Sequence, residues 1–337
     1  MRTMRRARIK VKGEGVYHVV SRIGGRRFLI DDTEKGILLG RIRAAAAFSG
    51  VEVYTYALMD NHFHLLIRVP ERVDVPEEEL RRRMLALYGP ERAAKVFALW
   101  EKWEAKGNGG RVEDEKRRLR ARMYDLSQFV KTFKESYTQD YNRRHDNTGT
   151  IWEGRFKSIL VEGAYRALMT VAGYIHLNPV RAEVVEAPEQ ARNTGYGAAC
   201  AGDALALRGV ESLAARAFGC ESMGWNAARE ACREAMDGAL SEEERFADPG
   251  VDVYTRGETG AEPGASGGAG RTGDGAVREL LRHRCVGFLH GGAVGRKEFR
   301  QALDRLLPER RRQRPEGILD RCRELGLAPV LGVREAS

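Results

Sequence analysis

Two histidines separated by a single residue are the side chains whose type and spacing could most clearly do chemistry. They lie in the segment His62-Phe63-His64-Leu65, inside an apolar stretch that predicts a β-strand over residues 62–69. Side chains alternate along a strand, so both imidazoles should share one face while Phe63 and Leu65 point into a core. Two imidazoles about 6–7 Å apart can converge on one divalent ion. Two surface histidines on a half-buried strand are the alternative interpretation, because short motifs also match by accident.

A tyrosine and an asparagine further along the chain supply the chemistry that the histidines lack. Tyr174 and Asn178 are four residues apart in a segment that predicts a helix over about 164–178, so they should share a helix face. Pro179 places Asn178 near the end of that helix. His176 should point away and is interpreted as a packing residue. The apolar positions that would dock this helix on a sheet are Leu168, Val171 and Ile175.

These segments resemble a known family. His62-Phe63-His64 resembles the histidine-hydrophobic-histidine motif of the HUH endonucleases, and residues 174–179 resemble the tyrosine helix of their single-tyrosine transposases. The run IWEGRFKS at 151–158, followed by YIHLNPVRA at 174–182, is similar to the branch called REP-associated tyrosine transposases. The resemblance covers about residues 8–200. The joint occurrence of these motifs in order is more specific than any one of them.

The resemblance implies an active site and a reaction. Tyr174 would be the catalytic nucleophile, with His62 and His64 as metal ligands and Asn178 as a third ligand, where related transposases often use glutamine. Such a site suits Mg²⁺ or Mn²⁺. The phenolate would attack phosphorus and leave a 5′-phosphotyrosine and a free 3′-hydroxyl. The expected substrate is single-stranded, hairpin-containing DNA.

Basic side chains near these motifs are candidate contacts for DNA phosphates. Arg155 and Lys157 lie in the 151–158 run, and Lys131 and Lys134 lie on the predicted helix before it. Each of them singly is more often a solvated surface charge.

Two other functions stay open. One is a non-catalytic regulator that keeps the same fold and binds hairpin DNA. The other is a relaxase or replication initiator with the same histidine pair, against which the run at 174–179 argues. The presence of Tyr174 together with both histidines favours catalysis, because a mere binder has no need for a phenol beside a metal site.

The order of predicted elements indicates the fold class. The predicted strands lie at 16–23, 51–58, 62–69 and 158–161. One predicted helix runs from the cap candidates at 31–33 to a stop at Gly50, and the others lie at about 77–104, 115–144 and 164–178. This order predicts an α+β fold with a ferredoxin-like split βαβ antiparallel sheet, an added catalytic helix and a mostly helical C-terminal region. The stretch at 77–104 is interpreted as an insertion or lid. The core face of the next helix should consist of Leu126, Phe129, Val130, Phe133 and Tyr137.

The resemblance and the composition together divide the chain into four predicted segments. The resemblance implies a single-tyrosine HUH transposase domain over residues 1–200, and alanine-rich composition predicts a helical extension over residues 201–248. Residues 249–275 are glycine-rich and predict a flexible linker. Residues 276–337 predict a small basic helical module that could add a nucleic-acid contact or simply form solvated charged helices.

Charge and cysteine content indicate which partners and which cellular compartment to expect. The 337 residues carry 57 Lys and Arg against 48 Asp and Glu, a formal charge of +9 that is typical of nucleic-acid binders. The five cysteines include no C-x-x-C pair, so neither a disulfide framework nor a cysteine zinc site is indicated. No apolar run is long enough to span a bilayer. We therefore expect a cytoplasmic protein with DNA and no membrane as its partner, and a homodimer is compatible with the sequence.

Overall fold

A computed structural model describes residues 11, 13–163, 165–241 and 293–294 of the chain. The chain divides into two compact units. The sheet unit comprises Lys10–Tyr54 and Leu58–Leu160, and the helical unit comprises, among the described residues, Thr55–Ala57 and those from Val161 onward. The histidine pair and Tyr174 therefore lie in different units.

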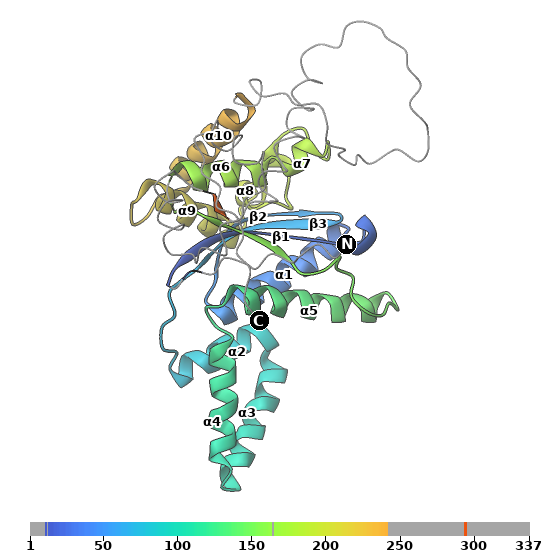
Figure 1. Cartoon of the computed structure of the whole chain (residues 1–337), viewed down its shortest axis with the longest axis vertical. Helices are drawn as coiled ribbons and strands as arrows, with labels where there is room; N and C mark the ends of the chain where they lie inside the picture. Colours follow the sequence, from blue (N-terminus) through green and yellow to red (C-terminus); the bar gives the residue numbers. More distant parts are fainter. Residues whose placement is uncertain (1–10, 12, 164, 242–292, 295–337) are drawn as a thin grey trace, which may run out of the picture. The chain divides into compact units, whose positions relative to one another are not determined.

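The predicted α+β class is confirmed by the sheet. Its order is β2-β3-β1-β4-β5, and the first four strands have the ferredoxin-like arrangement (Figure 1). β1 pairs with β3 in antiparallel register, from Gly15 opposite Val69 to Arg22 opposite His62. The strands are β1 (Gly15–Arg22), β2 (Glu52–Met59), β3 (His62–Val69), β4 (Lys157–Val161) and the two-residue β5 (Ala293–Val294).

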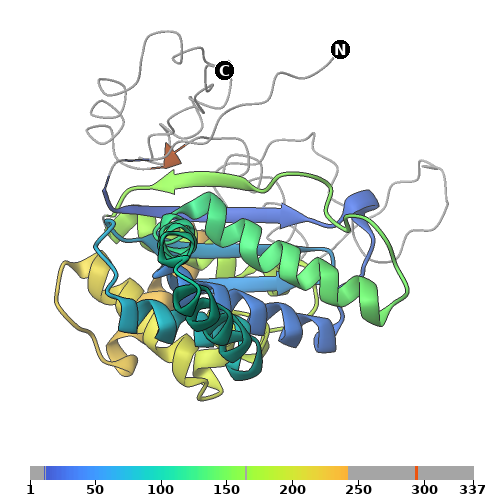
Figure 2. The same cartoon turned by 90° about the horizontal axis from the view of Figure 1, so that it is seen from below.

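Two long helices, α1 (Asp32–Ser49) and α5 (Leu126–Arg144), pack side by side in the sheet unit (Figure 2). Of the cap candidates at 31–33, Asp31 caps α1, because its side chain accepts a hydrogen bond from the backbone N–H of Glu34 at 2.8 Å. Gly50 ends this helix with a φ of 69°, a left-handed conformation that glycine adopts without strain. A short 3₁₀ turn, η1 (Gly24–Arg26), follows β1.

The apolar face of α5 forms the core against one side of the sheet, as the helical spacing predicted. The ring of Phe63 in β3 meets Phe133 at 5.5 Å and Trp152 at 5.6 Å between ring centroids, both edge to face. Trp152 and Phe156 are buried and belong to this core. The predicted core positions of α5 are all buried: Leu126, Phe129, Val130, Phe133 and Tyr137.

Each of the two long helical stretches predicted between β3 and β4 is in fact two helices. The first breaks at Gly89, where φ is 77° and Pro90 begins the next helix, since proline is favoured in a first turn but not inside a helix. The second breaks before Asp125, where Tyr124 has a φ of 54° and the side chain of Asp125 caps α5. The resulting helices are α2 (Glu77–Tyr88), α3 (Pro90–Ala105) and α4 (Gly109–Ala121).

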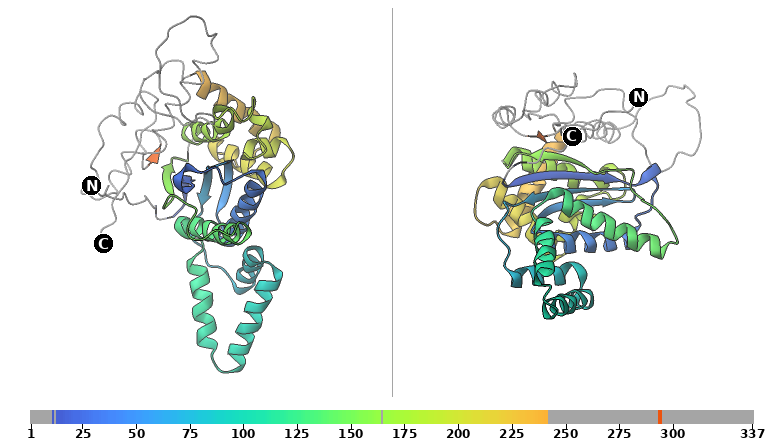
Figure 3. Two further views of the ribbon diagram at one scale, coloured as in Figure 1. Left: turned by 90° about the vertical axis from the view of Figure 1, so that its right-hand side faces the viewer. Right: turned by 60° about the horizontal axis from the view of Figure 1, so that its bottom comes forward.

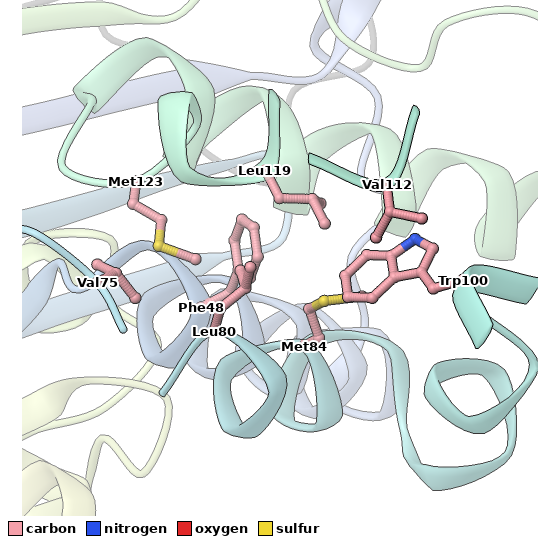
Figure 4. Packing of buried hydrophobic residues seen from close by; sticks show 8 residues of the cluster. All are labelled: Phe48, Val75, Leu80, Met84, Trp100, Val112, Leu119 and Met123. Carbon is pink, nitrogen blue, oxygen red and sulfur yellow. The ribbon is translucent and has the colours of Figure 1, made fainter. Parts of the chain in front are cut away.

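These three helices form an insertion with a core of its own. α3 and α4 run as a helical hairpin, and α2 packs against both α1 and α3 (Figure 3). The side chains of the core meet between α2, α3, α4 and the end of α1 (Figure 4), and they are Phe48, Val75, Leu80, Met84, Trp100, Val112, Leu119 and Met123. Of the two interpretations of this segment, the packing favours a fixed insertion over a lid, because an apolar core holds the helices to α1.

The helical unit contains the helix that carries Tyr174. This helix, α6 (Tyr165–His176), packs against both α9 and α10. The extension predicted at 201–248 contains α9 and α10, and its residues 242–248 lie outside the described residues. The remaining elements of this unit are α7 (Asn178–Arg181), η2 (Pro188–Gln190), α8 (Gly195–Cys200), α9 (Ala204–Phe218) and α10 (Trp225–Ser241).

The division into units does not fall at residue 200, where we predicted the end of the first domain. α6 and the helices of the predicted extension share one unit, because α9 and α10 pack on α6. The predicted linker at 249–275 and nearly all of the module at 276–337 lie outside the described residues. In the described part of the chain, no helix has the length and apolar character that crossing a membrane requires.

A buried carboxylate ties α1 to the end of α5. Glu34 is 2% exposed and accepts hydrogen bonds from Tyr137 Oη at 2.9 Å and from both Arg144 and His145. Burial alone would raise the pKa of Glu34, but these hydrogen bonds and the charge of Arg144 outweigh it and lower the pKa. Glu34 is therefore ionised and fully paired at neutral pH.

Replacing Glu34 with glutamine should lower the free energy of unfolding by about 1–3 kcal/mol at pH 7, the usual cost of leaving buried polar partners unsatisfied. The exposed pair Glu135 and Lys131 on α5 supplies the control Glu135→Gln, with an expected change within about 0.5 kcal/mol. Because the folded-state pKa of Glu34 is lowered, its contribution is present above the unfolded carboxyl pKa and is lost as pH falls through the folded value. Thermal unfolding from pH 7 to pH 3 measures this, and a wild-type advantage that persists unchanged in acid would contradict it.

Candidate active site

His62 and His64 lie together on β3 in the sheet unit. Their rings meet edge to face with centroids 5.0 Å apart, while Phe63 between them packs against Phe133 of α5. His64 is 2% exposed and His62 is half-buried. The alternative interpretation of two surface histidines is therefore wrong for His64.

The Nδ1 atom of each histidine is already engaged. Nδ1 of His62 lies 2.7 Å from Oδ1 of Asn61, and because that oxygen can only accept, Nδ1 carries the proton. Nδ1 of His64 lies 2.9 Å from Nε2 of His18. Nε2 is thus the nitrogen through which each ring could coordinate a metal. A hydrogen bond from the other ring nitrogen is typical of metal-binding histidines, since it holds the ring in one orientation.

His18 of β1 is a residue of this cluster that the sequence reasoning missed. In the β1–β3 register Val20 faces His64 and His18 faces Leu66, so His18 reaches His64 along the diagonal of the ladder. The two rings stack with centroids 5.1 Å apart. Burial lowers the pKa of His18 to about 3 and that of His62 to about 4, so both rings are neutral at pH 7. A histidine inside an otherwise apolar strand was the available signal, but only the register shows which histidine it meets.

Three of the four predicted phosphate-binding cations are exposed. Arg155 lies in the segment that leads into β4, Lys157 is the first residue of β4, and Lys131 lies on α5. Lys131 is 3.8 Å from Glu135, a surface pair that solvent screens strongly. These side chains are accessible to a polyanion.

The fourth cation, Lys134, is used inside the sheet unit. Its ammonium donates to Oγ of Ser21 at 2.7 Å and to the carbonyl of Gly154 at 3.2 Å, and it lies 4.7 Å from the centroid of the Trp152 ring. Lys134 is 8% exposed. Its charge therefore joins α5 to β1 and to the 151–156 segment.

In the helical unit, Tyr174 lies in the last turn of α6 and is 3% exposed. The guanidinium carbon of Arg181 lies 4.7 Å from the centroid of the Tyr174 ring. The backbone carbonyl of Tyr174 accepts a hydrogen bond from the side-chain amide of Asn178 at 2.9 Å. Tyr174 and Asn178 are thus neighbours, as their spacing predicted.

Asn178 does not lie on the same helix as Tyr174, contrary to the predicted helix at 164–178. α6 ends at His176, and Asn178 begins α7. Pro179 has no N–H to donate to the carbonyl of Ile175, so the helical ladder breaks here. The Nδ2 group of Asn178 donates to the carbonyls of Tyr174 and Ile175 instead, at 2.9 and 3.5 Å. Oδ1, on the other side of the planar amide, is the atom that could act as a ligand.

His176 has the packing role that its position predicted. It is fully buried, its Nε2 lies 2.8 Å from Oγ1 of Thr55, and its ring stacks on Tyr196 with centroids 5.3 Å apart. Burial lowers the pKa of His176 to about 3. His176 therefore anchors the end of α6 as a neutral ring.

The helix that carries Tyr174 is held closely by α10. A Cβ atom added at Gly173 would lie 3.0 Å from the carbonyl oxygen of Ala235, so glycine permits this close approach. The predicted docking positions Leu168, Val171 and Ile175 are all fully buried. The region after residue 200 thus supports the helix that carries Tyr174.

The structure brings the predicted site residues together in two sets. His62 and His64 lie with His18 in the sheet unit, and Tyr174 and Asn178 lie with Arg181 in the helical unit. Among the described residues, no group of three or more His, Cys, Asp or Glu side chains could hold a metal ion. The remaining ligands of a metal on the histidine pair would therefore be of other types, such as water, phosphate or amide oxygens.

Comparison with known proteins bears on this site. Residues 12–78 match the family model described as Transposase IS200 like, a segment that contains β1, α1, β2 and β3 and hence the histidine pair. No curated protein matches the chain. A solved REP-associated tyrosine transposase bound to a REP hairpin is similar over 60% of this chain and 87% of its own, at 16% identity and a TM-score of 0.39. The match to a transposase family model bears out the resemblance to REP-associated tyrosine transposases and supports a transposase role.

Because α9 and α10 pack on α6, their removal should expose the apolar side of the helix that carries Tyr174. A chain ending at residue 202 should aggregate or unfold more than about 10 °C below the full chain, since several buried side chains lose their partners. A chain ending at residue 241 keeps these helices and should unfold within a few degrees of the full chain. Circular dichroism and thermal unfolding test both, and a stable, cooperatively unfolding chain of residues 1–202 would contradict the supporting role.

Proposed function

We propose that this chain is a transposase that nicks single-stranded, hairpin-containing DNA and becomes covalently attached to it through Tyr174. The observation that carries the proposal is the histidine pair on β3, with both Nδ1 atoms engaged, inside the segment that matches the IS200-like transposase model. The Tyr174 and Asn178 cluster supplies the nucleophile and a third ligand in the roles that the resemblance implies.

The proposed chemistry begins at the phenol of Tyr174. Its oxygen attacks the phosphorus of a phosphodiester, a P–O bond forms to tyrosine, and the P–O bond to the 3′-oxygen breaks. The phenol loses its proton and the departing 3′-oxygen gains one. The products are a 5′-phosphotyrosine and a free 3′-hydroxyl, which can later attack the phosphotyrosine and rejoin a strand without an external energy source.

The resemblance implies a metal ion with open positions for this chemistry. In the proposed roles, Nε2 of His62, Nε2 of His64 and Oδ1 of Asn178 would hold Mg²⁺ or Mn²⁺, and each of these side chains has its other polar atom hydrogen-bonded, which favours a defined orientation. The bound ion would supply Lewis-acid polarisation of a phosphate oxygen. Asn61 and His18 would keep the two rings in their orientations, and the carbonyl of Tyr174 would do the same for the amide.

DNA contacts outside the reacting phosphate are proposed for the exposed cations. Arg155, Lys157 and Lys131 can pair with backbone phosphates, since their side chains are accessible. Lys134 was predicted with them, but its ammonium is bonded to Ser21 and Gly154, so its proposed contribution is to hold the 151–156 segment in place.

One observation favours a second function. Tyr174 is 3% exposed, which a regulator that binds hairpin DNA without cutting it would tolerate, whereas a nucleophile must reach its phosphate. Covalent attachment to DNA separates the two functions, since only the nickase forms a protein–DNA bond.

Tyr174→Phe should abolish covalent attachment and leave hairpin binding within about twofold, because only the nucleophilic oxygen is removed. The matched control is Tyr165→Phe, since Tyr165 begins the same helix and is 38% exposed. Incubation with labelled hairpin oligonucleotides, followed by denaturing electrophoresis, detects the adduct. An adduct that survives in Tyr174→Phe would overturn the assignment of the nucleophile.

His62→Ala and His64→Ala should each reduce nicking in Mg²⁺ or Mn²⁺ by at least about 100-fold, as for the loss of a ligand to a catalytic metal. His18→Phe keeps a ring of similar shape but removes the bond to Nδ1 of His64, so it should weaken metal affinity by about 10–100-fold and recover at higher metal concentration. Nicking rates across a metal titration, with EDTA as the zero point, measure this. Normal rates in His64→Ala would place the metal elsewhere.

A further inference from the structure

The carbonyl of Tyr174 is approached by two side chains from the segment that follows its helix. Nδ2 of Asn178 donates to it at 2.9 Å, and Nη1 of Arg181 donates to it at 3.5 Å. The guanidinium of Arg181 also lies over the Tyr174 ring, with Cζ 4.7 Å from the ring centroid. One arginine thus contacts both the backbone and the aromatic ring of the proposed nucleophile.

The segment that makes this contact follows the end of α6. Arg181 follows Tyr174 by seven residues and is the last residue of α7, which begins at Asn178 after α6 ends at His176. The backbone N–H of Arg181 donates to the carbonyl of Leu177 at 2.9 Å, and that of Ala182 donates to Asn178 at 3.0 Å. These bonds fix the turn of helix from which Arg181 reaches back to Tyr174.

Arginine suits this position better than other cations. A planar guanidinium can lie against an aromatic ring while its N–H groups, which point outward in the plane, reach a carbonyl. Both side chains have limited room to move, because Tyr174 is 3% exposed and Arg181 is half-buried. The ring of Tyr174 is held by contacts within its own unit.

We propose that Arg181 is a positioning residue for Tyr174, which it orients for attack on phosphorus. The inference rests on the proposed function of Tyr174 as the nucleophile. Attack requires the phenol oxygen in line with the scissile bond, and a displacement of about 1 Å can cost about 100-fold in rate. In this role Arg181 affects the rate of attack by Tyr174, whereas an arginine that bound DNA would affect the Kd for DNA.

The test compares full-length wild type with Arg181→Met and Arg181→Lys. Methionine keeps an unbranched side chain but loses the guanidinium, and lysine keeps the charge near the ring without the planar stack. Arg192 is exposed in the same unit, so Arg192→Met is the matched control. The substrate is a labelled hairpin oligonucleotide with a randomised single-stranded flank. Single-turnover measurements at saturating DNA give the rate and the end-point amplitude of covalent attachment, and a binding titration gives Kd.

In Arg181→Met the attachment rate should fall by about 10–100-fold. The Kd for DNA should stay within about twofold of wild type, and the end-point amplitude should be retained because every folded molecule can still react. Arg181→Lys should recover part of the rate, and it also serves if the methionine variant does not fold. Arg192→Met should match wild type in all three quantities.

Three results would overturn the positioning role while wild type forms the adduct. An unchanged rate in Arg181→Met shows that the contact is dispensable. A weaker Kd with a normal rate at saturation identifies Arg181 as a DNA contact. A reduced amplitude with a normal rate indicates a purely structural role, in which fewer molecules are folded. A wild-type protein that binds the hairpin but forms no adduct would overturn the proposed function itself, and this inference with it.

Discussion

The antiparallel pairing of β1 with β3 is the constraint on which the histidine cluster depends. The register places Val20 opposite His64, which brings His18 within 2.9 Å of His64 across two strands that are 46 residues apart in sequence. A shift of one residue would turn every side chain of the strand to the other face, exposing Phe63 and burying the imidazoles among the aromatic rings of the α5 side. The core contacts of Phe63 with Phe133 and Trp152 thus fix the direction in which the histidines point.

A similar dependence operates at the end of α6. Pro179 removes a backbone donor, the helix ends, and the amide of Asn178 donates to the carbonyls of Tyr174 and Ile175. Arg181 then reaches back over the tyrosine ring. Asn178 therefore begins a new helix while its amide stays bonded to the end of α6, and the same short helix carries the arginine that contacts the proposed nucleophile. An uninterrupted helix would carry Arg181 almost two turns beyond Tyr174.

Both units contain contacts outside the candidate clusters that hold their helices in place. The insertion formed by α2, α3 and α4 adds a separate apolar core to α1, and Glu34 joins α1 to α5 through Arg144 and Tyr137. In the helical unit, α10 approaches α6 closely at Gly173, one residue before Tyr174. Tyr174 is thus carried on a helix with little freedom to shift, which suits a reaction that depends on the placement of one oxygen atom.

The sequence by itself determined the local features. The alternation along β3, the cap at Asp31 and the apolar face of α5 follow from interactions within a few residues, and the structure agrees with each of them. Breaks at Gly89 and before Asp125 were missed because apolar periodicity continues across them. Only the tertiary structure decided that His18 meets His64 and that Lys134 turns inward to Ser21. Such contacts join residues far apart in the chain, so they depend on strand register and helix packing rather than on spacing.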